Sequence, residues 1–174
     1  MSNLIKRHTE SNKLNLKEKL NLSRSGKCLL VDTSGSMYET TEIGKAKYVI
    51  VNEILSKLEL NRIKLFEFND SCNEVTNIGL PTGSTNLSEA FNTIKNKGCS
   101  YCLLVTDGRP NNAETALEAS KGLKIDIIYI GNPPVPEFLT KLGTVVDNSF
   151  NFIELNKIEN VKELENKIKG FISE

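Results

Sequence analysis

Runs of consecutive apolar residues alternate along this chain with segments in which apolar residues recur every three or four positions. The runs have the length and composition of buried strands, since a strand covered on both faces is apolar throughout. We predict such strands at residues 27–32, 62–68, 101–106, 125–130 and 150–155. The half-polar segment 74–78 has the composition of a short edge strand.

The segments between the runs have helical periodicity. In the segment 44–58, an apolar face is predicted from Ala46, Val49, Ile50, Ile54 and Leu58. Further helices are predicted at residues 86–97, 113–121, 136–142 and 161–172. Strands that alternate with helices predict an α/β fold, in which a mostly parallel sheet is covered on both faces.

Composition bounds the domain organisation. A chain of 174 residues is long enough for one domain with a real core. The net charge is zero, which argues against nucleic acid as the main partner. Residues 1–27 hold seven Lys and Arg against two Asp and Glu, a net charge of +5. We therefore expect residues 1–25 to form a basic N-terminal arm, partly helical at 12–22, and residues 26–174 to form the domain. The arm is either solvated or a contact for an acidic partner.

The sequence indicates neither a membrane-spanning segment nor a secretion signal. No segment is apolar and long enough to span a bilayer, and the start of the chain lacks a signal-peptide pattern. We therefore expect a cytoplasmic protein whose four cysteines, Cys28, Cys72, Cys99 and Cys102, are reduced. Cys99 and Cys102 have the spacing of a redox or zinc pair. No second pair accompanies them, however, and the one histidine is distant in sequence, so we expect core residues instead.

Candidate chemistry begins where the first apolar run ends. Asp32, Ser34 and Ser36 follow that run directly, and Gly35 permits a sharp turn between the two serines. Ligands of α/β proteins bind outside the carboxyl ends of the parallel strands. Three oxygen-bearing side chains at such a place suit a hard divalent cation such as Mg²⁺, Mn²⁺ or Ca²⁺.

The segment Asp32-Thr33-Ser34-Gly35-Ser36 resembles the Asp-x-Ser-x-Ser signature of von Willebrand factor A domains. That signature is the first part of the family's metal-ion-dependent adhesion site. Thr85, in a glycine-containing loop, matches the family's threonine, and Asp107, after a strand-like run, matches its second aspartate. The resemblance is therefore to a domain with a complete adhesion site, of the intracellular bacterial or viral type. It implies a doubly wound, mostly parallel sheet with one short antiparallel edge strand and helices on both faces.

The resemblance also implies how the site is used. Ser34 and Ser36 would be direct ligands, Thr85 direct or through water, and Asp32 and Asp107 reached through water. The open position would be filled by a carboxylate of a partner protein, so that the metal is a bridge and not a catalyst. The set is too small for a closed calcium cage, so Mg²⁺ is expected, with Mn²⁺ and Ca²⁺ as alternatives. Ser84 is an alternative to Thr85.

Three functions compete at this point. The first is a metal-dependent protein-interaction module, which is not an enzyme and has no catalytic residue. The second is a metal-dependent phosphohydrolase, in which the haloacid-dehalogenase type would need an acid where the chain has Ser34. The third is a structural or assembly subunit with a non-essential metal site. No feature of the sequence indicates the partner's identity or the oligomeric state.

Overall fold

The computed structural model describes residues 26–145 and 149–174. The predicted basic arm at 1–25, with its helix at 12–22, lies outside the described residues. The domain boundary at residue 26 therefore stays a prediction.

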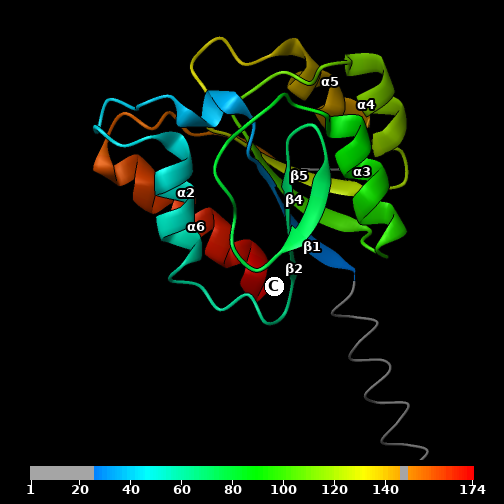
Figure 1. Cartoon of the computed structure of the whole chain (residues 1–174), viewed down its shortest axis with the longest axis horizontal. Coiled ribbons are helices and arrows are strands. Elements are labelled where there is room, and N and C mark those ends of the chain that lie inside the picture. The colour runs from blue at the N-terminus through cyan, green and yellow to red at the C-terminus, as the bar shows by residue number, and fades with distance from the viewer. Residues whose placement is uncertain (1–25, 146–148) are drawn as a thin grey trace, which may run out of the picture.

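One six-stranded sheet forms the centre of the described chain (Figure 1). Its strands lie in the order β3-β2-β1-β4-β5-β6, and β3 alone is antiparallel to its neighbour. Their bounds are Lys27–Asp32 (β1), Lys64–Phe68 (β2), Cys72–Val75 (β3), Tyr101–Thr106 (β4), Lys124–Tyr129 (β5) and Phe150–Phe152 (β6). The prediction of a mostly parallel sheet with one short antiparallel edge strand is confirmed.

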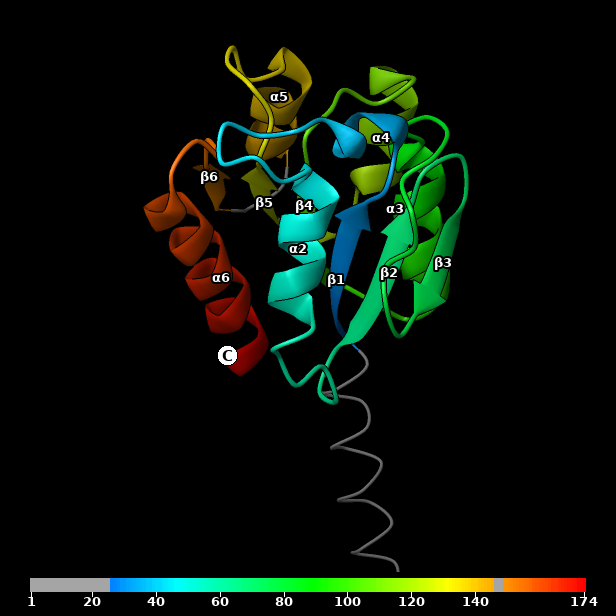
Figure 2. The same ribbon diagram turned by 60° about the vertical axis from the view of Figure 1, so that its left-hand side comes forward.

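Helices cover both faces of the sheet, as Figure 2 shows with the molecule turned. Two of them pack on one face and three on the other. The first pair is Lys47–Leu55 (α2) and Ile158–Ser173 (α6). The second group is Leu87–Asn96 (α3), Ala113–Ser120 (α4) and Glu137–Val145 (α5). The three layers are those of a doubly wound α/β fold.

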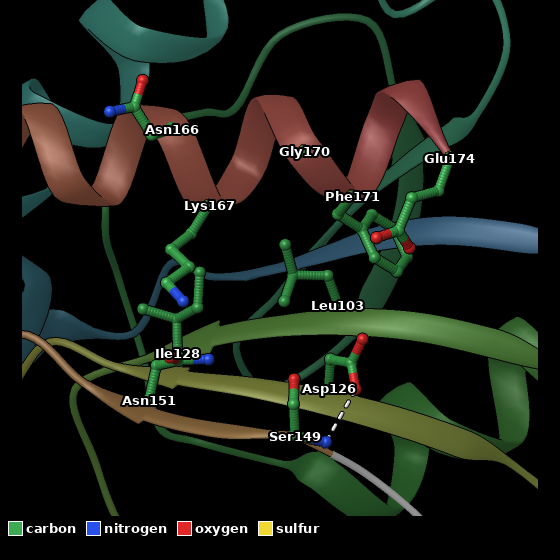
Figure 3. A pocket seen from close by; sticks show the side chains of 10 residues that line it. All are labelled: Leu103, Asp126, Ile128, Ser149, Asn151, Asn166, Lys167, Gly170, Phe171 and Glu174. Carbon is green, nitrogen blue, oxygen red and sulfur yellow. Dashed lines mark hydrogen bonds between the residues drawn. The ribbon is translucent and has the colours of Figure 1, made fainter.

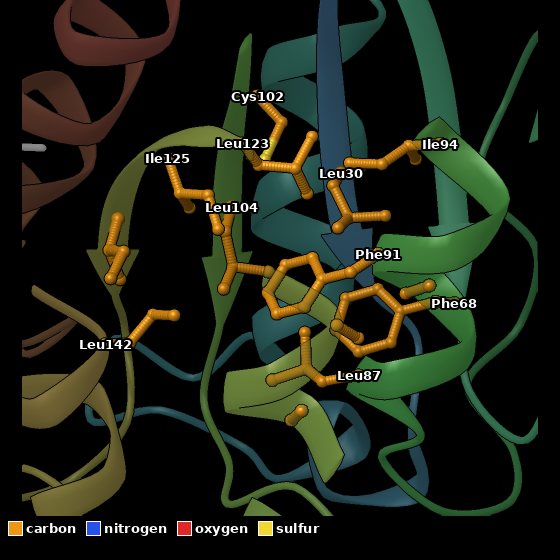
Figure 4. Packing of buried hydrophobic residues seen from close by; sticks show 14 of the residues in the cluster. Leu30, Phe68, Leu87, Phe91, Ile94, Cys102, Leu104, Leu123, Ile125 and Leu142 are labelled. Carbon is orange, nitrogen blue, oxygen red and sulfur yellow. The ribbon is translucent and has the colours of Figure 1, made fainter. Parts of the chain in front are cut away.

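The alternation of side chains along β1 divides the core in two. Leu30 points into the cluster under α3, α4 and α5, and Leu29 and Val31 point into the cluster under α2 and α6. Figure 4 shows the first cluster, in which Phe68 and Phe91 lie beside Leu30. Because β1 is buried on both faces, it is apolar throughout until the chain reaches Asp32.

The four cysteines are core residues. All are free and buried, and all belong to the cluster under α3, α4 and α5. Cys28 and Cys102 are register partners on the neighbouring strands β1 and β4. Burial raises the pKa of Cys72 to about 12, so this thiol stays protonated at neutral pH.

Several predicted boundaries were wrong by a few residues. Helix α2 begins at Lys47 and not at residue 44, because a bridge between Thr40 and Ala46 holds the preceding chain in a turn. The edge strand β3 begins earlier than predicted, β6 ends at Phe152, and α5 continues to Val145. None of the helices in the described part of the chain has the length and apolar character needed to cross a membrane.

The strand order places a topological switch beside β1. The connection from β1 to β2 passes through α2 on one face, and the connection from β4 to β5 passes through α4 on the other face. The chain that follows β1 and the chain that follows β4 therefore lead to helices on opposite faces of the sheet. Such a switch is where ligands bind in doubly wound proteins.

Candidate metal centre

Asp32 ends β1 with a carboxylate that is fully buried. Its Oδ1 atom accepts a hydrogen bond from the backbone N–H of Ser34 at 2.8 Å. Its Oδ2 atom accepts one from the Thr106 hydroxyl, at the end of β4, at 2.6 Å. Both oxygens are thereby held in place where the two central strands end.

The two serines follow in a single turn. Ser34 precedes the short 3-10 helix Gly35–Tyr38, and its hydroxyl lies 3.2 Å from that of Ser36. The backbone N–H of Gly35 donates to the carbonyl of Gly83 at 3.1 Å. This bond joins the first loop to the loop that carries Thr85.

The third loop brings Asp107 to the same point. The hydroxyl of Ser36 donates to Asp107 Oδ1 at 2.7 Å, and the Asp107 side chain is fully buried. A hydrogen bond between two of the predicted site residues therefore connects the loop after β1 to the loop after β4.

Gly108 marks the centre of the cluster. A Cβ atom built on Gly108 would lie 3.5 Å from Thr85 Oγ1, 3.8 Å from Ser36 Oγ and 3.9 Å from Asp32 Oδ2. Oxygens from two loops and from the end of β1 thus surround the space that a side chain would fill. The five residues predicted from the sequence, Asp32, Ser34, Ser36, Thr85 and Asp107, all lie at this edge of the sheet.

The geometry distinguishes Thr85 from the neighbouring hydroxyl of Ser84. Ser84 donates its hydroxyl to the Asp70 carboxylate and accepts a hydrogen bond from the Asn111 side chain at 2.7 Å. Asn111 also binds Thr85 through two bonds, one to its N–H and one from its own N–H to the Thr85 carbonyl. The Ser84 hydroxyl therefore links Asp70 to Asn111. The Thr85 hydroxyl instead lies near the Gly108 position, with the other oxygens of the cluster.

Lys47 is a site residue that the sequence analysis missed. Its ammonium lies 2.7 Å from Asp107 Oδ2 and 2.6 Å from Glu39 Oε2, and its side chain is 6% exposed. Burial alone would lower the pKa of Lys47, but the hydrogen bonds to Asp107 and Glu39 outweigh it, and the pKa is raised. Lys47 therefore carries its charge at neutral pH.

A signal for Lys47 was present in the sequence. Lys47 precedes Ile50, Val51 and Ile54 by three, four and seven positions, which is the spacing of one helix face. The structure buries these four residues together, a face slightly rotated from the predicted one. A lysine on a buried helix face must find a counter-ion. The same spacing could not have identified Thr106, whose role depends on the register of β1 against β4.

Burial dominates the electrostatics of Asp32. It raises the pKa of Asp32 to about 6, against the hydrogen bonds from Ser34 and Thr106 that favour the charged form. The charge of Asp107 raises it further. The buried Asp32 carboxylate is thus incompletely compensated, and additional positive charge would stabilise it.

The donor set fits a hard cation of the magnesium type. Within residues 26–145 and 149–174, no group of three or more His, Cys, Asp or Glu side chains is arranged so that it could hold a metal ion by itself. The candidate centre instead combines two carboxylates with three hydroxyls. An all-oxygen set that includes neutral groups suits a cation that keeps part of its water shell.

Besides a cavity of about 440 Å³ between Leu58 and Lys169 of α6, two further cavities lie near the helices of the α2 and α6 face. One, of about 180 Å³, is beside the candidate centre and is lined in part by Lys47, Glu39 and Glu154. The other, of about 270 Å³, lies between α6 and the sheet, where Asp126 accepts a hydrogen bond from the Ser149 N–H (Figure 3). None of the five predicted site residues lines either cavity.

No family model matches the chain, and no curated protein matches it by sequence. Solved structures do match. A conserved hypothetical protein, BatB, from Bacteroides thetaiotaomicron superposes with a TM-score of 0.58 at 13% identity, over 86% of this chain and 99% of that one. A mutated aerotolerance-related membrane protein from Bacteroides fragilis NCTC 9343 gives 0.62 at 13% identity, over 85% and 98%.

A third similar structure carries the family name. A von Willebrand factor type A protein from Catenulispora acidiphila superposes with a TM-score of 0.63 at 15% identity, over 86% of this chain. The match spans 43% of that protein's own length. Likeness at this level of identity establishes the fold. The chain therefore has the α/β fold of von Willebrand factor A domains.

Proposed function

We propose that this chain is a metal-dependent protein-interaction module, which binds an acidic side chain of a partner protein through a divalent cation. One observation carries the proposal: the oxygens of Thr85, Ser36 and Asp32 all lie 3.5–3.9 Å from a Cβ position built on Gly108. Such a convergence of hydroxyls and carboxylates from separate loops serves no evident purpose in packing.

Asp32, Ser34, Ser36, Thr85 and Asp107 would hold the cation. Mg²⁺ is the expected ion, with Mn²⁺ and Ca²⁺ as alternatives. When bound, the cation supplies an electrophilic position for a carboxylate oxygen. The chain's own residues prepare the site: Thr106 and the Ser34 N–H orient Asp32, and Ser36 orients Asp107.

Exposed apolar side chains near the loops of the centre support a partner-binding surface. Tyr38 is 46% exposed just past the first loop, where its ring packs edge-on against that of Tyr48. Leu80, which precedes the second loop, is 67% exposed. An aromatic and an aliphatic side chain beside a charged centre are typical of interaction surfaces.

The test is a thermal melt in EDTA, Mg²⁺, Mn²⁺ or Ca²⁺, with Asp32→Ala beside the wild type. A ligand that binds only the folded state adds about 2.7 kcal/mol at a hundredfold its dissociation constant. We expect Mg²⁺ or Mn²⁺ to raise the wild-type Tm and to leave the variant unchanged. Two results together would contradict the proposal. None of the three cations would change the wild-type Tm, and Asp32→Ala would still capture the partner protein.

A second candidate is an assembly subunit in which the metal site is not essential. The observation that favours it is the exposed edge of the sheet at β6, where Phe150 and Phe152 are each 39% exposed. Unpaired edges and exposed aromatic rings are both used for association. Partner binding that persists in EDTA and is lost in Phe150→Ser would favour this role.

An enzymatic role is the least supported. Ser34 stands where a haloacid-dehalogenase-type phosphohydrolase needs its acid, so we assign no catalytic residue. Turnover of a generic phosphate ester that disappears in Asp32→Ala would reverse this assignment.

A further inference from the structure

The cavity of about 270 Å³ between α6 and the sheet has charged side chains at both of its ends (Figure 3). Lys167 extends from α6 toward Asn151 at one end, and Asp126 and Glu174 lie at the other. The cavity is smaller than the pockets of about 300–1,000 Å³ that take drug-sized ligands. It therefore suits a small molecule that carries charges of both signs.

Asp126 places a carboxylate on a face of the sheet that is otherwise apolar. Its register partner on β4 is Leu103, the next residue on the same face of β5 is Ile128, and both are buried. The carboxylate accepts hydrogen bonds from the Tyr101 hydroxyl and the Ser149 N–H. In the described part of the chain, no ion pair involves Asp126. A carboxylate has about four lone-pair sites, so Asp126 can still accept a cationic group.

Lys167 supplies the opposite charge on the other side of the cavity. It lies on α6 seven residues before Glu174, a separation of about 10 Å along a helix. Neither side chain makes an ion pair with another residue that the structure describes. The two ends of the cavity are thus far enough apart to contact opposite ends of one extended small molecule.

The charge of the lining indicates the charge of the ligand. Three charged side chains line the cavity, with a net charge of −1: Asp126, Glu174 and Lys167. Two further ammonium groups lie nearby and are already engaged. Lys27 donates to the Phe171 carbonyl at 2.9 Å, and Lys124 lies 4.2 Å from the centre of the Tyr101 ring. Neither lysine lines the cavity, so a matching ligand has two cationic groups and one carboxylate.

Gly170 keeps the α6 side of the cavity open. Spacings of three and four place it on the same helix face as Lys167 and Glu174. Nothing lies within 4 Å of a Cβ atom built on Gly170, and its φ is not positive. Neither packing nor backbone conformation therefore requires glycine, although glycine is among the poorest helix formers. Its absent side chain leaves room for a ligand beside Lys167.

We propose that this cavity binds a free basic α-amino acid, such as lysine or arginine. The side-chain cation contacts Asp126 and Glu174, and the α-carboxylate contacts Lys167, with the α-ammonium near Asn151. Three apolar residues form the wall on which the methylene groups of the ligand lie: Leu103, Ile128 and Phe171. This binding is independent of the proposed metal-dependent function.

The test is isothermal titration calorimetry of the full chain in EDTA, with L-lysine, L-arginine, L-norleucine and cadaverine as separate ligands. Norleucine lacks the side-chain cation of lysine, and cadaverine lacks its carboxylate. Each ligand therefore reports on one end of the cavity.

Three variants change the cavity itself. Asp126→Asn removes the charge at one end, Lys167→Met removes the charge at the other, and Gly170→Leu fills the space beside α6. Lys162→Met is the matched control, since Lys162 is exposed on α6 and does not line the cavity. Circular dichroism checks that each variant is folded.

We expect lysine and arginine to bind the wild type at least about tenfold more tightly than norleucine or cadaverine. Asp126→Asn should weaken lysine binding about tenfold and leave norleucine binding unchanged. Lys167→Met should weaken lysine binding and leave cadaverine binding unchanged. Gly170→Leu should abolish the binding of all four ligands, and Lys162→Met should behave as the wild type does.

No saturable binding of either basic amino acid at millimolar concentrations would overturn the inference. Equal binding of lysine and norleucine would also overturn it, because the site would then recognise no side-chain cation. If Asp126→Asn fails to fold, Lys167→Met and Gly170→Leu decide, since both leave the hydrogen bonds of Asp126 intact. Because EDTA is present throughout, each of these failures leaves the proposed metal-dependent function standing.

Discussion

Ser36 and Asp107 lie 71 positions apart in the chain and share a hydrogen bond of 2.7 Å. One follows β1 and the other follows β4, and the parallel pairing of these strands brings the two ends together. The bond orients a carboxylate toward hydroxyls that the chain supplies from other loops. It joins the loop after β1 to the loop after β4 at the candidate centre.

Gly108→Ala tests the space at the middle of the centre. The added methyl group would make ordinary contacts of 3.5–3.9 Å with the surrounding oxygens, so the domain should fold. We expect the Tm in EDTA to change by only a few degrees and the Mg²⁺-induced shift to disappear. Gly170→Ala in α6 is the control, since nothing lies near its Cβ position and its Mg²⁺ response should be unchanged. A full Mg²⁺ shift in Gly108→Ala would show that the cation binds elsewhere.

Thr106→Val tests the support of Asp32. The substitution keeps the shape of the side chain but removes the donor to Asp32 Oδ2, which leaves a buried carboxylate oxygen without that partner. We expect a loss of about 1–3 kcal/mol in the free energy of unfolding in EDTA, measured with urea. Thr93→Val, on the exposed face of α3, should cost less than about 1 kcal/mol. Equal losses in the two variants would mean that the bond to Asp32 contributes nothing.

The raised pKa of Asp32 predicts an unusual pH dependence. Its pKa of about 6, against the ordinary aspartate value of 3.8, means that the folded state binds this proton more tightly than the unfolded state. Unfolding between pH 4 and 6 therefore releases a proton, and the stability contributed by Asp32 falls as pH rises through that window. The contribution is at most about 3 kcal/mol. Asp32→Asn should lack it.

Urea unfolding in EDTA at pH 4, 5, 6 and 7 measures this effect as the difference between the wild type and Asp32→Asn. The subtraction removes the shared contributions of other groups, such as Asp70 and Glu137, whose lowered pKa values act in the opposite direction. A difference that does not change with pH would contradict the burial argument for Asp32.

Gly83→Ala tests how the second loop is held. Gly83 has φ +69, and a Cβ atom there would collide with the Asp70 side chain. We expect a loss of about 2 kcal/mol or more in the free energy of unfolding. Gly44→Ala is the matched control, because Gly44 has φ +79 with open space around it and measures backbone strain alone. The excess loss in Gly83→Ala should also appear as a weaker Mg²⁺ response.

The sequence predicted the fold well where burial dominates. The strands at Lys27–Asp32 and Tyr101–Thr106 were predicted to the residue, because a strand covered on both faces is apolar from end to end. The helix predicted at residues 86–97 is α3, and its cap residue Asn86 accepts a hydrogen bond from the Glu89 N–H through its side chain. The predicted start of α2 was wrong because a short backbone bridge between Thr40 and Ala46, not the period of the apolar residues, sets it.

The candidate centre was predictable only in part. The three oxygen-rich loops were predicted from the family resemblance, and the structure brings them to one edge of the sheet. Their role in binding a metal stays a prediction. Thr106 was missed because its role depends on a partner on another strand. Lys47 was missed although its spacing from Ile50, Val51 and Ile54 places it on the buried face of α2. The choice between Ser84 and Thr85 likewise needed the position of Asp70, which no local pattern contains.

Strand β1 pairs with β2 on one side and with β4 on the other. During synthesis, the edge of β1 that will pair with β4 therefore has no partner until residues 101–106 have left the ribosome. The nascent chain would carry an apolar strand with unpaired backbone groups through the production of α2, β2, β3 and α3. Asp107 follows β4 directly, so the last oxygen of the centre arrives as that edge closes. Assembly of the centre would therefore report that both edges of β1 are paired, and chaperone binding to this strand should end near the same point of translation.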